Sequence, residues 1–312
     1  MWRFGWRIQR FELAAVLMMG AAAAVAAAYV AFRLAEVAPP ADCLRDYLAA
    51  GIARPDCPSV RPFFGLSQDL SGKVLGPMMV LPVFLGVLPG ASLVAGEIEH
   101  RTAQLSWMLM PLRRRWLLVR LLPVMCVVIL ASALAAFAAE RLVGEVMPWL
   151  DPRSSFTEYG ARGPVLVFRT VAFTSIGLLI GALVGRQMPA LVISVVACLA
   201  LLILLMVSRP FGEPVVVSDG FQYPEGALPV GGAYRAEDGT MLSYQEVVKR
   251  APAGMSQDRT QEWAEDTHER VTLTVPGDRL AAVELRESVM LSVISATAVI
   301  ATMVVIQRRR PY

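Results

Sequence analysis

The sequence predicts an all-α polytopic membrane protein with six transmembrane helices, and two observations carry this prediction. First, six stretches of 16 to 23 residues contain no Lys, Arg, Asp or Glu, although the chain has 29 basic and 26 acidic side chains among its 312 residues. About 20 apolar residues at 1.5 Å per residue cross a hydrocarbon layer of about 30 Å. Second, these stretches lack the polar face that a helix of a soluble domain shows to water. A soluble globular fold is therefore excluded.

The charge-free stretches place the expected helices along the chain. They are residues 13–32, 74–96, 121–139, 164–185, 187–208 and 288–306. The fourth is extended to residue 164 because its charge-free part is too short to cross a bilayer alone. A cleaved signal peptide is the alternative for the first stretch, which has a basic start and an alanine-rich end. Its apolar run is longer than a typical signal core.

The distribution of charge predicts the orientation of the chain. With a cytoplasmic N-terminus, the inner segments hold 12 Lys and Arg against three acids, and the outer segments hold 17 against 23. Short segments rich in Lys and Arg stay in the cytoplasm. Residues 1–12 and a tail of residues 307–312 are therefore expected inside.

Two outer segments carry features of their own. Cys43 and Cys57 lie 14 residues apart on one outer loop, where an oxidising compartment permits a disulfide. Two free thiols are the alternative. Residues 209–287 are long enough for a small α+β extracytoplasmic insertion between helices five and six. There, Ser243 and Glu246 have the spacing of a capping box.

Motifs for catalysis or nucleotide binding are missing from the sequence. Gly72-Lys73-Val74 lacks the Ser or Thr that follows the lysine of a phosphate-binding loop. No G-x-S-x-G or H-E-x-x-H pattern occurs. His100 and His268 are expected on opposite sides of the membrane, which argues against a shared metal site. We therefore expect a chain that is not an enzyme and holds no cofactor or metal.

Polar and small residues inside the expected helices point to packing or transport. Arg169 is the one charge expected within a span, either reaching the outer interface or lining a substrate pathway. Gly177, Gly181 and Gly185 form a smooth stripe for close approach of another helix, within the chain or in a dimer. Prolines and glycines in the second span, including Gly86 and Gly90, predict a kink.

The segment 97–116 between helices two and three has the most informative pattern. Two acidic residues at the end of a span precede a short amphipathic stretch, a proline and a basic-aromatic entry into the next span. This pattern predicts a short rigid helix along the inner surface that a soluble partner can push. An ordinary positive-inside connector is the alternative.

At these residues the chain resembles the ABC type-2 permease family, whose members carry an acidic-x-acidic-x-Gly-Thr element, then Pro and a basic residue. Arg101 stands where the family has glycine. Residues 1–12 are similar to the family's amphipathic elbow helix. The matching loop residues are Glu97, Glu99, Thr102, Pro111 and Arg114, and the elbow anchors are Trp6, Arg7 and Arg10.

The resemblance implies the membrane half of an exporter. In a bacterial plasma membrane, a separate ATPase subunit would hold ATP and Mg²⁺ and act on the loop 97–116. Glu97 and Glu99 would orient the helix of this loop, through pairs with basic residues of that partner. A second permease chain, identical or different, would complete the pathway in the lipid bilayer, and no nucleic acid is involved. A membrane sensor or assembly factor with a ligand-binding outer domain is the alternative.

Overall fold

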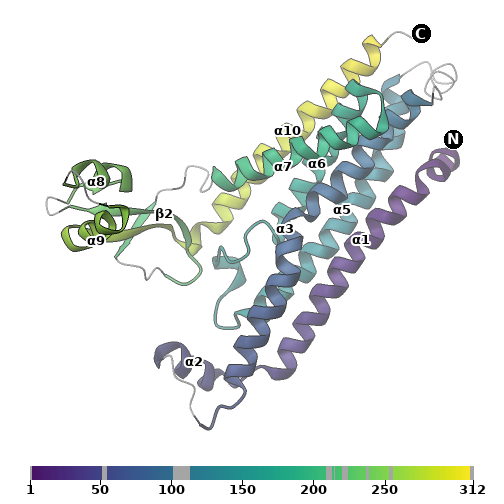
Figure 1. Ribbon diagram of the computed structural model, residues 1–312. Coiled ribbons are helices and arrows are strands. Elements are labelled where there is room, and N and C mark those ends of the chain that lie inside the picture. Colours follow the sequence, from purple (N-terminus) through teal and green to yellow (C-terminus); the bar gives the residue numbers. More distant parts are fainter. Residues whose placement is uncertain are drawn as a thin grey trace. The chain divides into compact units, whose positions relative to one another are not determined.

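The computed structural model describes residues 2–50, 55–100, 113–208, 213, 215–219, 224–236, 239–252 and 256–309. The chain divides into two compact units (Figure 1). The helical unit comprises Met1–Trp149, Glu158–Val207 and Glu284–Tyr312. The sheet unit comprises Leu150–Thr157 and Ser208–Val283.

Six helices of the described residues are long and apolar enough to cross a membrane, which confirms the predicted class of polytopic membrane protein. A short helix, α2 (Ala41–Ala50), follows the first of them. The six are α1 (Trp2–Val37), α3 (Val60–Glu99), α5 (Arg113–Val146), α6 (Gly163–Val184), α7 (Gln187–Val207) and α10 (Leu280–Arg308).

Several helices extend well beyond the apolar stretches that predicted them. Helix α3 begins 14 residues before the expected residue 74 and continues through Pro77, Pro82 and Pro89. Helix α1 runs without a break from Trp2 through the first span, so a separate elbow helix over residues 1–12 is not confirmed. Residues 6–12 contain no Pro, Gly, Ser, Thr, Asp or Asn that would end a helix before the apolar run.

Helices α3 and α6 lie backbone to backbone at the centre of the helical unit. A Cβ atom built on Gly86 would come within 2.7 Å of the Thr170 carbonyl oxygen, and one on Gly181 within 2.5 Å of the Ala91 carbonyl oxygen. Only glycine permits so close an approach. The glycine stripe of α6 therefore packs inside this chain. Gly185 ends the helix instead, with a φ of 68°.

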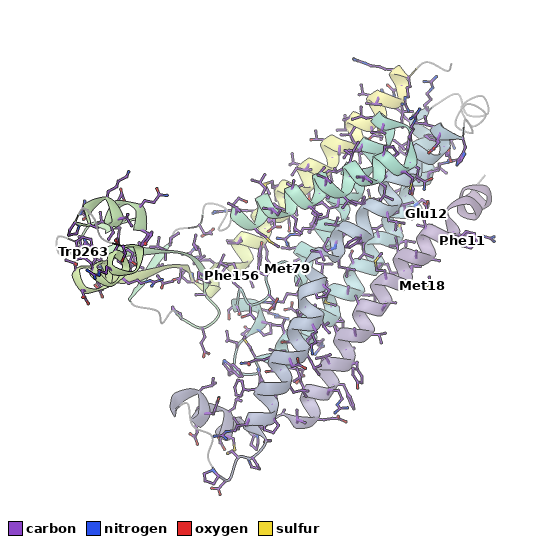
Figure 2. The ribbon with its side chains drawn as sticks, viewed as in Figure 1. Phe11, Glu12, Met18, Met79, Phe156 and Trp263 are labelled. Carbon is purple, nitrogen blue, oxygen red and sulfur yellow. A yellow bond between two sulfur atoms is a disulfide. The ribbon has the colours of Figure 1, made fainter. Side chains whose placement is uncertain are left out.

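The outer faces of the helical unit are apolar, as a lipid environment requires. On α1, Phe11 and Met18 are 73% and 65% exposed (Figure 2). Between them, the Glu12 carboxylate accepts a hydrogen bond of 2.7 Å from the Ser92 hydroxyl of α3. This contact gives the acidic side chain a partner and joins the two helices.

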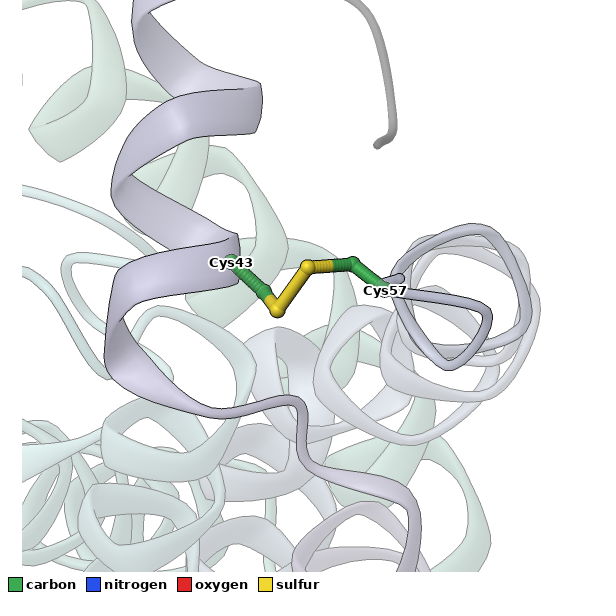
Figure 3. The surroundings of a disulfide bond; sticks show 2 residues. All are labelled: Cys43 and Cys57. Atoms are coloured by element: carbon green, nitrogen blue, oxygen red, sulfur yellow. A yellow bond between two sulfur atoms is a disulfide. The ribbon is translucent and has the colours of Figure 1, made fainter. Parts of the chain in front are cut away.

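A disulfide closes the segment between α1 and α3. It joins Cys43 on α2 to Cys57 just before α3, with a Cα–Cα distance of 5.7 Å (Figure 3). Nearby, the Phe64 ring packs against the rings of Tyr47 and Trp149 at 4.9 and 5.8 Å. We call this end of the helical unit, where α3 and α6 begin, the disulfide end.

The described residues of the sheet unit form four antiparallel strands in the order β1-β4-β2-β3 and two α-helices, α8 and α9. Tyr234, Leu242, Val247 and Ala264 form its buried core, with Trp263 packed against them (Figure 2). The elements are β1 (Val216–Asp219), β2 (Leu228–Arg235), β3 (Met241–Leu242), α8 (Tyr244–Arg250), α9 (Gln257–Thr267) and β4 (Glu269–Val275).

Two local features hold the sheet unit together. The Phe156 amide donates a 2.8 Å hydrogen bond to the Gly226 carbonyl, so residues 150–157 belong to this unit although they precede α6. Ser243 and Glu246 form the capping box that their spacing predicts at the start of α8. The hydrogen bonds that the Ser243 amide and hydroxyl donate to the Glu246 carboxylate lower the pKa of that group.

Candidate functional site

The ends of α3, α6 and α10 and the starts of α5 and α7 meet opposite the disulfide end. Charged side chains join these five termini to one another. We call this region the arginine end and define it by Glu97, Glu99, Arg113, Arg114 and Arg309.

Glu97 joins α3 to α5 at the arginine end. Its carboxylate is buried and forms an ion pair with Arg120, whose guanidinium lies 4.9 Å from the centre of the Trp116 ring. Removing one member of a buried pair costs about 3–5 kcal/mol because a lone charge stays out of water. The last turn of α3 is therefore fixed to the first turns of α5.

Glu99 joins the same turn of α3 to α7. Its Oε2 atom accepts a 2.7 Å hydrogen bond from the backbone amide of Gln187, the first residue of α7. The first amides of a helix have no partner within the helix, and the positive end of its dipole attracts a carboxylate. Although Glu99 is exposed, its position is thus set by a helix terminus of its own chain.

Arginines bind the carbonyl groups at the ends of α10 and α6. Arg113 donates hydrogen bonds of 2.9 and 2.8 Å to the carbonyls of Ile306 and Arg309. Arg309 in turn donates to the Leu183 carbonyl near the end of α6, at 3.4 Å. Cations at helix C-termini satisfy the last carbonyls and complement the helix dipole.

Glu97 and Glu99 have partners within the chain, and their pairing with basic residues of another subunit stays a prediction. Arg114 lies beside Gln307 of α10, at 3.4 Å. Arg10 lies over the Phe11 ring, at 4.8 Å from its centre. Arg101, Thr102 and Pro111, and the side chains of Trp6 and Arg7, fall outside the described residues.

Sequence reasoning missed several residues of the arginine end. Arg113, Gln187, Gln307 and Arg309 were not singled out, although polar and basic residues at helix termini are common capping groups. The predicted helix boundaries placed Arg113 eight residues before its span, and this hid its position in the first turn of α5.

A second charged cluster lies within the helical unit near the disulfide end. Arg169 of α6 and Glu287 of α10 are both 0% exposed, and their Nε and Oε1 atoms are 2.6 Å apart. The Tyr159 hydroxyl donates a 2.7 Å hydrogen bond to Glu287, and the Gly160 carbonyl accepts one of 3.4 Å from Arg169. Arg169 is therefore held inside the helical unit and does not extend to solvent.

Glu287 was not predicted as the partner of Arg169. The expected insertion ended at residue 287, but α10 already begins at Leu280 and carries Glu287 on its buried side. Nearby, Arg162 pairs with Glu140 of α5 at 2.9 Å. Among the described residues no group of three His, Cys, Asp or Glu could hold a metal ion.

The six apolar helices and their charged termini define a multi-pass membrane protein. The family model described as ABC-2 membrane transporter related matches residues 7–209, and the chain belongs to this family. No curated protein and no solved structure matches the chain. The family match confirms the resemblance inferred from the loop residues and makes the chain, at family level, a membrane transporter permease. It spans α1 to α7 and ends before α10.

Proposed function

We propose that this chain is the permease subunit of an ATP-driven exporter in a bacterial plasma membrane, with both termini in the cytoplasm. A separate ATPase subunit would hydrolyse ATP with Mg²⁺, and a second permease chain would complete the pathway. The observation that carries the proposal is the arginine end, where charged contacts link the ends of five helices, among them the two helices that residues 101–112 connect.

The arginine end supplies a mechanical route from the connecting segment to the bundle. Residues 101–112 join α3 to α5, so a force on this segment reaches the ends of both helices directly. Glu99 passes displacement of α3 to α7, and Arg113 passes displacement of α5 to α10. Arg101, Thr102, Pro111 and Arg114 would form the surface that the ATPase contacts.

In this proposal Glu97 and Glu99 are positioning residues. Their bonds to Arg120 and to the start of α7 hold the last turn of α3, from which the connecting segment starts. Trp6, Arg7 and Arg10 would anchor the start of α1 among lipid headgroups, where aromatic and basic side chains are favoured.

Co-purification tests the partnership. A tagged full-length chain is extracted from its native membrane in detergent, and the particle is analysed by mass spectrometry and ATP hydrolysis. We expect an ATPase subunit in a fixed ratio to the permease. A homogeneous particle with no ATP-hydrolysing subunit would overturn the proposal and favour a sensor or assembly factor.

Substitution of Glu99 tests the coupling role. We expect Glu99→Gln to lower ATP hydrolysis by the lipid-reconstituted complex about tenfold, since a weaker neutral hydrogen bond replaces a charge-assisted one. The exposed side chain makes misfolding a minor concern. Glu36→Gln is the matched control, because Glu36 is half-exposed and pairs with Arg33 on the same helix. Equal hydrolysis by the two variants would remove Glu99 from the coupling route.

A further inference from the structure

The buried cluster near the disulfide end contains a fully buried ion pair, Arg169 with Glu287, which packing alone does not require. A pair of opposite charges at 0% exposure must give up its hydration, and apolar side chains of similar volume often stabilise a fold equally well. Buried charges within membrane helices tend to serve a function. The pair joins α6, at the centre of the helical unit, to α10.

The Arg169–Glu287 pair is a specific contact that fixes the position of the first turns of α10. Leu285, Val289 and Val293 on the outer side of α10 are each more than half exposed. Glu287 lies on the opposite, buried side, where it binds both Arg169 and Tyr159. Apolar contacts allow a helix to slide, whereas an ion pair with a second hydrogen bond defines one position.

The segment before α6 is shaped around the guanidinium of Arg169. Glu158 has a φ of 54° and Gly160 a φ of 90°, both in the left-handed region. A Cβ atom on Gly160 would overlap the Arg169 guanidinium. The conformation of this segment therefore requires a strained backbone at Glu158 and a glycine at position 160. Backbone strain of this kind persists only where surrounding contacts hold it in place.

The course of the chain connects this cluster to the sheet unit. The chain passes from the sheet unit to the helical unit after Thr157 and again after Val283. Tyr159 and Glu287, which hydrogen-bond to each other, follow these two points by two and four residues. The hydrogen bond between Tyr159 and Glu287 therefore joins the two chain segments that lead out of the sheet unit. Displacement of either segment acts on this hydrogen bond directly.

We propose that Arg169, Glu287 and Tyr159 form a releasable clasp that closes the helical unit at the disulfide end. The clasp holds α10 against α6 in the state described here. It opens when α10 moves during transport, and water then replaces its contacts. This inference rests on the proposed transport function. The two chain segments that follow Thr157 and Val283 connect the sheet unit to the clasp residues.

Access of water to the first turns of α10 tests the clasp. Ser288→Cys is the reporter, because Ser288 follows Glu287 and is 8% exposed. It is placed in a full-length chain carrying Cys126→Ser and Cys198→Ser, reconstituted in lipid vesicles. The rate of reaction with a membrane-impermeant maleimide is measured. Ala298→Cys, further along α10 and 5% exposed, reports whether the whole helix has loosened.

Two changes open the clasp without leaving a lone buried charge. Tyr159→Phe removes one hydroxyl, and Arg169→Gln with Glu287→Gln removes both charges together. We expect each to raise labelling at position 288 about tenfold, because a lost hydrogen bond or ion pair shifts the opening equilibrium by that order. Labelling at position 298 and the thermal unfolding midpoint should not change.

An ion pair within α1 supplies the control. Arg33→Gln with Glu36→Gln also removes one basic and one acidic side chain, but this pair lies on a single helix and does not involve α10. We expect no faster labelling at position 288. Unchanged labelling in folded Tyr159→Phe and in the clasp double variant, or equal labelling in the control, would overturn the clasp. The chain is tested without an ATPase, so this result is separate from co-purification.

Discussion

At the scale of single residues, the function of a charge depends on a partner that the sequence does not reveal. Arg169 could be singled out because it is a lone charge in an apolar stretch. Its partner Glu287 is 118 positions away, and no periodicity or spacing connects them. Likewise Glu97 and Glu99 could be selected from the loop pattern, whereas their partners Arg120 and Gln187 required the packing of helices.

The close fit between Gly160 and Arg169 gives a prediction at this scale. We expect Gly160→Ala to lower the free energy of unfolding by about 2–5 kcal/mol, from a strained backbone and from displacement of the guanidinium. Gly239→Ala is the control, because Gly239 has a similar φ of 83° but open space around it. It should cost only about 1 kcal/mol. Chemical denaturation in detergent distinguishes the two, and equal losses would contradict the fit.

At the scale of elements, the central contact of the helical unit was half predicted. The repeat of Gly177 and Gly181 indicated close approach of another helix, but the partner remained open. Gly86 and Gly90 of α3 complete the contact, although in the sequence we interpreted them as part of a kink. Four glycines, two on each helix, allow α3 and α6 to approach closely at one crossing. The periodicity along α6 reveals the glycines of that helix but not those of its partner.

The crossing predicts opposite effects for two glycines of α3. A Cβ atom on Gly90 would overlap the Thr174 carbonyl, so Gly90→Ala should separate the helices and cost about 2–3 kcal/mol. Gly76 has open space, and Gly76→Ala should be neutral or stabilising by up to about 1 kcal/mol. Thermal unfolding in detergent measures both. A harmless Gly90→Ala would show that the backbones are not in contact.

At the scale of the whole molecule, the charge-free stretches predicted six spans but not the lengths of their helices. Hydropathy marks where lipid surrounds a helix, and a helix continues until a cap or breaker ends it. This is why α3 and α5 extend beyond the predicted 74–96 and 121–139. The capping box of α8 was predictable because it is local, whereas the strand order β1-β4-β2-β3 depends on distant pairing.

The disulfide gives a prediction for the stability of the whole chain. Cys43→Ser with Cys57→Ser should lower the free energy of unfolding by about 3 kcal/mol, because the bridge closes a loop of 14 residues in the unfolded state. Cys126→Ser removes an exposed free thiol and should have little effect. Denaturation without reductant measures the difference. Equal stability of the two variants would show that the bridge does not constrain the chain.

The Arg169–Glu287 pair also sets an order for biosynthesis. The ribosome completes α6 long before it reaches α10, so Arg169 is made without its counterion. A lone arginine in a bilayer is unfavourable, by up to about 2.5–3.5 kcal/mol at the bilayer centre on insertion scales and by less nearer an interface. Helix α6 can therefore settle fully only after the C-terminal helix has been synthesised, and a nascent chain truncated before Glu287 would expose an unpaired cation to the quality-control proteases of the membrane.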